Sequence, residues 1–187
     1  MFDPLLKRLA APALAKAAAP LAPLGADLVS LAGFAVGLAV IPAVARHAYL
    51  AGLGLLLLNR LVDALDGAVA RQTRATGRGA FLDMTLDLIV FCGVPFGFAL
   101  ADPSHALAAV FLVFAIAASG AAAVFLNAQG WTIAGFIGRA MGDTELTLAF
   151  AVACLWPDAF GLIAYIAGAL CFLTAGGRIA LAWDREP

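Results

Sequence analysis

The sequence predicts an all-α, polytopic membrane protein, and three observations support that prediction. Of the 187 residues, 64% are hydrophobic and 12% are charged, whereas soluble domains average about 25% charged residues. The apolar residues form runs that approach the roughly 20 residues a membrane-spanning helix needs. Most basic residues fall on one side of those runs. The mean hydropathy of +1.01 excludes an ordinary soluble globule or a disordered chain, and the net charge of −1 excludes a nucleic-acid-binding protein.

The N-terminal segment, residues 1–26, differs from the rest of the chain. It contains Lys7, Arg8 and Lys16 among alanines, leucines and four prolines. Lys16 and the prolines interrupt the continuous apolar stretch that a signal peptide requires. We therefore predict an amphipathic juxtamembrane segment that lies on the membrane surface, followed by a single transmembrane domain over residues 27–187.

Polar breaks divide the transmembrane domain into about six spanning helices. Their predicted ranges are 28–45, 48–71, 80–100, 106–127, 143–156 and 159–182. Asp27 and Ser30 offer N-caps to the first of them. Small residues recur at four-residue spacing, as in the pairs Gly33/Gly37 and Gly93/Gly97, and such pairs allow neighbouring helices to approach closely.

The basic residues predict the orientation. With the N-terminus in the cytoplasm, Arg46 alone faces outside and Arg60 lies within the second span. The remaining basic residues fall inside, as the positive-inside rule requires: they are Lys7, Arg8, Lys16, Arg71, Arg74, Arg78, Arg139, Arg178 and Arg185. Both termini are therefore predicted to be cytoplasmic.

Carboxylates inside the second and third spans indicate a functional site, because charges within a membrane are costly. Asp63, Asp66 and Arg71 share one helix face, and Asp83 and Asp87 are stacked four residues apart on the next helix. We expect these faces to oppose each other near the cytoplasmic end. Arg60 lies three residues before Asp63, a spacing that favours an ion pair between them.

This arrangement suits divalent cations and a phosphorylated ligand. Inward-facing carboxylates bind hard ions such as Mg²⁺ or Mn²⁺, and two ions about 3.5–4 Å apart clamp a diphosphate and polarise its phosphorus. Gly67 and Ala70 leave space for a ligand against the helix backbone, and Arg71 offers a planar donor fork for phosphate. One carboxylate can accept the proton of an attacking hydroxyl group.

The pattern resembles the signature of the CDP-alcohol phosphotransferases, membrane enzymes of phospholipid synthesis. Residues 63–87 contain all eight signature residues, namely Asp63, Asp66, Gly67, Ala70, Arg71, Gly79, Asp83 and Asp87. The spacer between Arg71 and Gly79 is shorter than usual in the family, and Leu88 stands where an arginine is common. The chain also resembles members of this family in its six predicted spans, its predicted cytoplasmic termini and its predicted surface N-terminal segment.

The resemblance implies a role for each signature residue. Asp63, Asp66, Asp83 and Asp87 would hold two divalent metals, Mg²⁺ or Mn²⁺, and Asp87 would also be the general base. The residues around the CDP moiety would be Asn59, Asp63, Asp66, Gly67, Ala70, Arg71 and Gly79. The donor would be CDP-diacylglycerol, the product CMP would be released, and the protein would be a homodimer in a bacterial-type inner membrane.

The sequence leaves two classes of acceptor alcohol open. Arg139 and Arg178, at predicted cytoplasmic span ends, favour a polyol phosphate such as glycerol 3-phosphate or inositol phosphate. Glu145 and its neighbour Asp143 favour an amino alcohol such as serine. A divalent-cation transporter is an alternative of another class, but transporter sites lie near the membrane midplane, whereas these aspartates lie toward the cytoplasmic interface.

Overall fold

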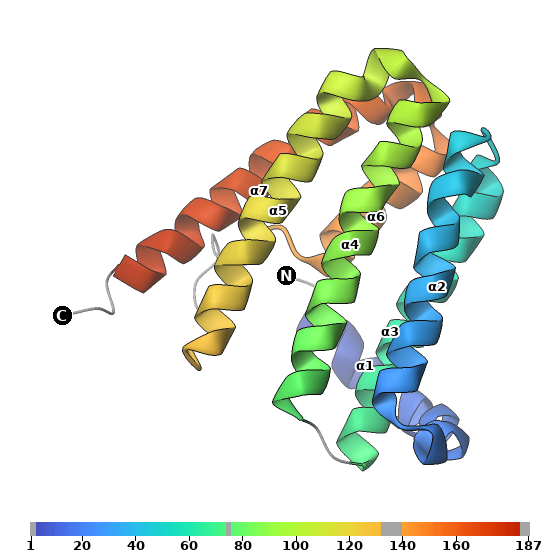
Figure 1. The fold of residues 1–187 in the computed structure, drawn as a ribbon, viewed down its shortest axis with the longest axis vertical. Helices are drawn as coiled ribbons and strands as arrows, with labels where there is room; N and C mark the ends of the chain where they lie inside the picture. Colours follow the sequence, from blue (N-terminus) through green and yellow to red (C-terminus); the bar gives the residue numbers. More distant parts are fainter. Residues whose placement is uncertain (1–2, 74–75, 132–139, 184–187) are drawn as a thin grey trace.

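The computed structural model of the chain describes residues 3–73, 76–131 and 140–183, and within these ranges it contains seven α-helices and no strand (Figure 1). The helices are α1 (Asp3–Ala18), α2 (Ala26–Ala45), α3 (Tyr49–Gln72), α4 (Gly77–Ala101), α5 (Ala106–Ala128), α6 (Asp143–Leu155) and α7 (Phe160–Trp183). Short 3-10 helices, η1 (Ala19–Leu24), η2 (Pro103–His105) and η4 (Pro157–Ala159), lie between some of them. The all-α prediction is confirmed.

Helices α2 to α7 occupy the six predicted spans, but they differ in how well they suit a membrane. Four stretches are long and apolar enough to cross one, namely Ala26–Ala45, Gly77–Ala101, Pro103–Ala128 and Pro157–Trp183. Helix α3 has sufficient length, at 24 residues, but it carries the charges of the predicted site. Helix α6 has only 13 residues, about 20 Å at roughly 1.5 Å per residue, which is shorter than the hydrocarbon core of about 30 Å.

Large apolar side chains cover the outside of the protein. Leu107, Phe114 and Ile179 are 73%, 67% and 60% exposed. A soluble monomer rarely exposes such a continuous apolar surface, whereas lipid chains solvate it without cost. Together with the long apolar helices, this surface identifies a polytopic integral membrane protein.

Helix α2 is the element that positions the site, because it packs along both α3 and α4 (Figure 1). Its start differs from the prediction: the N-cap is Gly25, whose φ of 78° suits glycine, and Ser30 donates to the carbonyl of Ala26 within the helix instead of capping it. The helix begins at Ala26, so Asp27 lies in its first turn. Helices α5 and α7 lie side by side, and α5 also packs against α4. Toward the lower left of Figure 1 the pair diverges from α2, α3 and α4.

The predicted close approach of glycine-bearing helices is confirmed for α2 and α4. A Cβ added at Gly93 would lie 2.5 Å from the Ile41 side chain, and one added at Gly97 would lie 2.9 Å from the Ile41 carbonyl oxygen. The contact at Gly97 is with backbone, which cannot rotate away, so glycine is required there, where α4 crosses the second half of α2. The same four-residue spacing predicts a third pair, Gly138 and Gly142, of which Gly138 lies outside the described residues.

Gly97→Ala should destabilise the protein by about 1–3 kcal/mol, the cost typical of overpacking a tight contact. The added methyl meets backbone, so α2 and α4 must move apart to accommodate it. Thermal unfolding in detergent measures this effect. Gly176→Ala in α7 is the matched control, since a Cβ there meets nothing within 4 Å; equal unfolding temperatures for the two variants would contradict the proposed contact.

The N-terminal helix lies against the end of α3 that carries the aspartates. Ala18 is fully buried against Ala68 and Val69, and the Gln72 side-chain amide donates to the carbonyl of Ala15 over 2.7 Å. Residues 1–26 thus include a helix that supports the C-terminal half of α3. That this segment lies on the membrane surface stays a prediction.

Candidate active site

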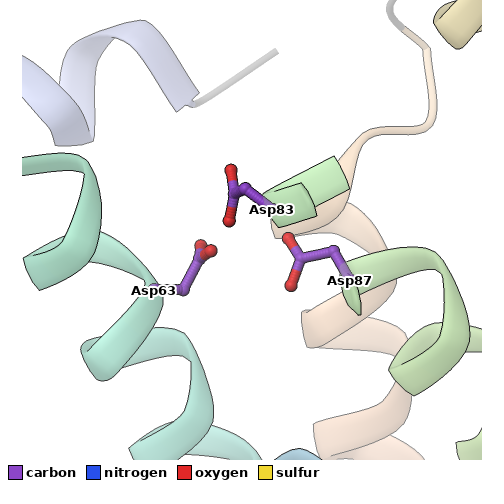
Figure 2. Close-up of side chains that lie close together, drawn as sticks. All are labelled: Asp63, Asp83 and Asp87. Atoms are coloured by element: carbon purple, nitrogen blue, oxygen red, sulfur yellow. The ribbon is translucent and has the colours of Figure 1, made fainter. Parts of the chain in front are cut away.

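Three of the four predicted carboxylates form a close cluster. Asp63 projects from α3, and Asp83 and Asp87 project from adjacent turns of α4 toward it (Figure 2). One oxygen from each lies within 4.8 Å of the oxygens of the other two. The i, i+4 spacing places both α4 aspartates on one face, as the sequence predicts. Helices α3 and α4 are joined through α2, which packs against both, and the aspartates face each other between them.

Asp66 belongs to the same pocket but stands outside this cluster of three. It is 5% exposed and lines the pocket together with Asp63, Asp83 and Asp87. The sequence predicted that all four would converge; the structure brings three together and places the fourth in the adjoining wall. Helix α2 also lines the pocket, through Ser30, Gly33 and Phe34.

Arg60 is hydrogen-bonded to Asp87, whereas the i, i+3 spacing had favoured Asp63 as its partner. Its Nη1 donates to Asp87 Oδ2 over 3.1 Å and its Nη2 donates to Asp87 Oδ1 over 2.5 Å. The predicted i, i+3 contact with Asp63 also exists, but at 3.7 Å it is the longer one. No local spacing connects residues on α3 and α4, so this pairing was visible only in the folded chain.

Asn59 lies deep in the pocket and links α3 to α2. It is 3% exposed, and its amide nitrogen donates to the carbonyl of Gly33 over 2.9 Å. Its oxygen accepts two hydrogen bonds from Arg60, at 3.0 and 2.7 Å. Asn59 was predicted to bind CDP; in this structure its polar atoms bond to the protein, and it also lines the pocket.

The remaining CDP-binding candidates extend from the pocket along the two helices. Gly67, Ala70 and Arg71 follow the aspartates toward the end of α3, and Arg71 is exposed. A Cβ added at Gly67 would contact only the Arg71 guanidinium, at 3.5 Å. Gly79 lies in the first turn of α4, where its N–H donates to the Thr76 hydroxyl that caps the helix.

Of the acceptor candidates, the described residues Arg178 and Glu145 are not among those that line this pocket. Arg178 of α7 donates from Nη1 to the carbonyl and the hydroxyl of Ser119 in α5, at 2.6 and 2.9 Å. The Glu145 carboxylate accepts from the Gly142 N–H at the start of α6. Arg139 lies outside the described residues. Arg178 thus links α7 to α5, and Glu145 caps the start of α6.

The clustered oxygens fit a divalent cation. Carboxylates are the preferred ligands of Mg²⁺ and Mn²⁺, and a metal–oxygen distance of about 2.0–2.6 Å allows oxygens within 4.8 Å of one another to share one ion. The cluster is also half-buried between helices, where three carboxylates without a neutralising cation would be energetically costly. The donor set and its spacing both suit the metal-assisted chemistry that the sequence predicts.

Comparison with known proteins agrees with this geometry. Residues 24–175, more than half of the chain, match the family model of CDP-alcohol phosphatidyltransferase. The chain belongs to this family. It is therefore related to transferases of phospholipid synthesis, which use a divalent metal and an alcohol acceptor, and the alternative of a cation transporter loses its support.

Two relatives and one solved structure show how far the likeness extends. Inner membrane protein YnjF of Escherichia coli K12 is 41% identical over 165 residues, which cover 82% of this chain and 80% of that protein. Archaetidylinositol phosphate synthase of Methanothermobacter thermautotrophicus is 39% identical over 87 residues, 46% of this chain and 42% of that protein.

The crystal structure of Mycobacterium tuberculosis phosphatidylinositol phosphate synthase (PgsA1) with CDP-DAG bound superposes with a TM-score of 0.77. The match covers 91% of this chain and 93% of that chain at 22% identity. At that level of identity the likeness concerns the fold. The family transferase fold thus extends over nearly the whole chain.

Proposed function

We propose that the protein transfers a phosphatidyl group from CDP-diacylglycerol to a small polar alcohol and releases CMP. The observation that carries the proposal is the cluster of Asp63, Asp83 and Asp87, with oxygens within 4.8 Å of one another, in a chain of this family. The mycobacterial structure with CDP-DAG bound supports the choice of donor.

Asp63, Asp66, Asp83 and Asp87 are proposed to hold two divalent ions, Mg²⁺ or Mn²⁺. When bound, these ions neutralise the diphosphate and polarise its phosphorus. Gly67 and Ala70 leave room for the nucleotide along α3, and Asn59, Arg71 and Gly79 border it. The exposed Arg71 has the planar fork that matches phosphate oxygens.

In the proposed reaction the Asp87 carboxylate accepts the proton of the acceptor hydroxyl. The hydroxyl oxygen forms a bond to the phosphorus that carries diacylglycerol. The bond from that phosphorus to the oxygen bridging it to CMP breaks, and CMP leaves with the electron pair. The acceptor is thereby joined to the lipid by a new phosphodiester.

The proposed location is an inner membrane with both termini and the site facing the cytoplasm, where soluble CMP leaves. The sequence supports this orientation through the basic residues Arg71, Arg74 and Arg78, which fall between the second and third predicted spans or beside their ends. We also propose a homodimer, as the family resemblance implies. Residues 27–187 would form the catalytic domain.

The proposal is tested with the purified full chain in detergent, labelled CDP-diacylglycerol and Mg²⁺ or Mn²⁺. Each candidate acceptor is offered separately, and CMP release and the lipid product are measured. Cation-dependent CMP release that needs an alcohol is the expected result. CMP release that is unaffected by chelator would contradict the metal-dependent mechanism.

For the acceptor we propose a polyol phosphate, such as glycerol 3-phosphate or inositol phosphate. The archaeal relative is an archaetidylinositol phosphate synthase and the mycobacterial one a phosphatidylinositol phosphate synthase, and both support this choice. The basic residues Arg139 and Arg178 support it as well. Serine or another amino alcohol is the second candidate, since Glu145 offers a carboxylate to an amine.

Arg139→Ala should raise the KM for the phosphorylated acceptor by about tenfold or more, because charge-assisted hydrogen bonds to phosphate are strong. Glu145→Ala should change this KM little, since Glu145 caps α6. Steady-state kinetics with the acceptor varied measure both effects. The opposite order, together with turnover on serine alone, would favour the amino-alcohol acceptor.

A further inference from the structure

The Arg60 side chain occupies the position that a cation would be expected to take beside Asp87. Both Asp87 oxygens accept hydrogen bonds from its guanidinium, at 3.1 and 2.5 Å, and Asp63 lies 3.7 Å from Nη1. The side chains of Arg60 and Asp87 are only 14% and 20% exposed. This ion pair is therefore poorly screened by water, and its electrostatic effect is correspondingly large.

Two further contacts, with Asn59 and Phe91, fix the Arg60 guanidinium. Asn59 Oδ1 accepts from Nε and Nη2, and the Phe91 ring lies under the guanidinium, with 4.8 Å from Cζ to the ring centroid. Asn59 is in turn anchored to α2 through the carbonyl of Gly33. Arg60 is thus fixed from α2, α3 and α4 together, so its fork constrains the orientation of the Asp87 carboxylate.

The same contacts bear on metal binding. Asp87 faces Asp63 and Asp83 across the cluster (Figure 2), yet both its oxygens are engaged by Arg60. A cation that binds Asp87 must share or replace those hydrogen bonds, and it also meets the repulsion of a positive charge a few ångströms away. Without a cation, the guanidinium offsets the repulsion among the three carboxylates.

We propose that Arg60 is a positioning residue with two effects: it orients Asp87 within the cluster, and it competes with the divalent cation for that carboxylate and so weakens metal binding. The proposal rests on the proposed function, since it takes the aspartate cluster as the metal site. It goes beyond that function by assigning a role to a residue outside the predicted set.

The test measures the affinity of the purified full chain for Mn²⁺. Electron paramagnetic resonance reports the concentration of free Mn²⁺ during the titration. Arg60→Gln removes the charge and should tighten Mn²⁺ binding by about tenfold or more. It should also lower the unfolding temperature without metal. It should enlarge the increase that Mn²⁺ produces, because the stabilisation by a ligand grows with the logarithm of its affinity. At saturating Mn²⁺ its kcat should fall, since Asp87 is no longer oriented.

Arg60→Lys separates charge from geometry. Lysine keeps the positive charge but lacks the planar fork, so it should tighten Mn²⁺ binding less than glutamine does while still lowering kcat. This variant decides the question if Arg60→Gln does not fold. Arg46→Gln is the matched control: Arg46 is exposed at the far end of α2, and its loss should leave Mn²⁺ affinity and kcat unchanged.

The outcomes separate the two proposals. Folded Arg60→Gln or Arg60→Lys with wild-type Mn²⁺ affinity and kcat would overturn the role of Arg60 and leave the proposed function standing. Weaker Mn²⁺ binding in Arg60→Gln would also overturn it, because it would make Arg60 a support for the metal. A wild-type protein that neither binds Mn²⁺ nor releases CMP would overturn the proposed function, and this inference with it.

Discussion

Asp83→Asn should lower the rate of CMP release by roughly 100-fold or more, the scale on which loss of one electrostatic contact to a transition state acts. Asn keeps the shape of the side chain but removes the negative charge. Asp83 is one of three carboxylates whose oxygens lie within 4.8 Å of one another, so Mn²⁺ affinity should fall as well. Initial rates at saturating CDP-diacylglycerol, over a titration of Mn²⁺, measure both effects.

The matched control for this change is Asp158→Asn. Asp158 is exposed in η4 (Pro157–Ala159), outside the pocket, and the same loss of charge there should leave the rate unaltered. The comparison requires that both proteins elute as folded species in detergent. Near wild-type turnover of a folded Asp83→Asn protein would show that the cluster is not the metal site.

Gly67→Leu should weaken CDP binding by roughly 100-fold or more, since a few kcal/mol of steric conflict corresponds to that change in affinity. Gly67 follows Asp66 on the helix face where the nucleotide is proposed to lie. An added Cβ at Gly67 meets only the Arg71 guanidinium, at 3.5 Å, which is an ordinary contact. The effect should therefore appear in ligand binding while folding is retained. Isothermal titration with CDP in the presence of Mn²⁺ measures it.

Two variants test whether that loss is steric. Gly67→Ala adds one methyl group and should have an intermediate effect. Gly54→Leu places the same side chain on the same helix, at a position where a Cβ meets nothing within 4 Å, and CDP affinity should remain at the wild-type value. Unchanged CDP affinity in Gly67→Leu would place the nucleotide elsewhere on the protein.

Much of the fold follows from local properties of the sequence. Apolar runs bounded by polar breaks locate helices α2 to α7, because a helix that contacts lipid must satisfy its backbone internally and present apolar side chains. The spacing of Asp83 and Asp87 places both on one face of α4, since four residues make about one helical turn. The signature in residues 63–87 was sufficient to identify the family, which the match over residues 24–175 confirms.

Other features of the site depend on contacts between helices, and periodicity along one helix carries no information about them. Local spacing paired Arg60 with Asp63, but the folded chain brings Asp87 closer. The part of α2 in the pocket wall was not predicted either, because nothing in the spacing of Ser30 and Phe34 refers to α3 or α4.

The sequence by itself therefore determined the membrane class, the helices and the set of carboxylates, because each depends on composition or on the geometry of a single helix. The tertiary structure decided which carboxylates cluster, with Asp66 in the adjoining wall, and which cation holds Asp87. The physical reason is that helix packing joins residues 27 positions apart, as in the pair Arg60 and Asp87. The position of α2 between α3 and α4 sets that distance.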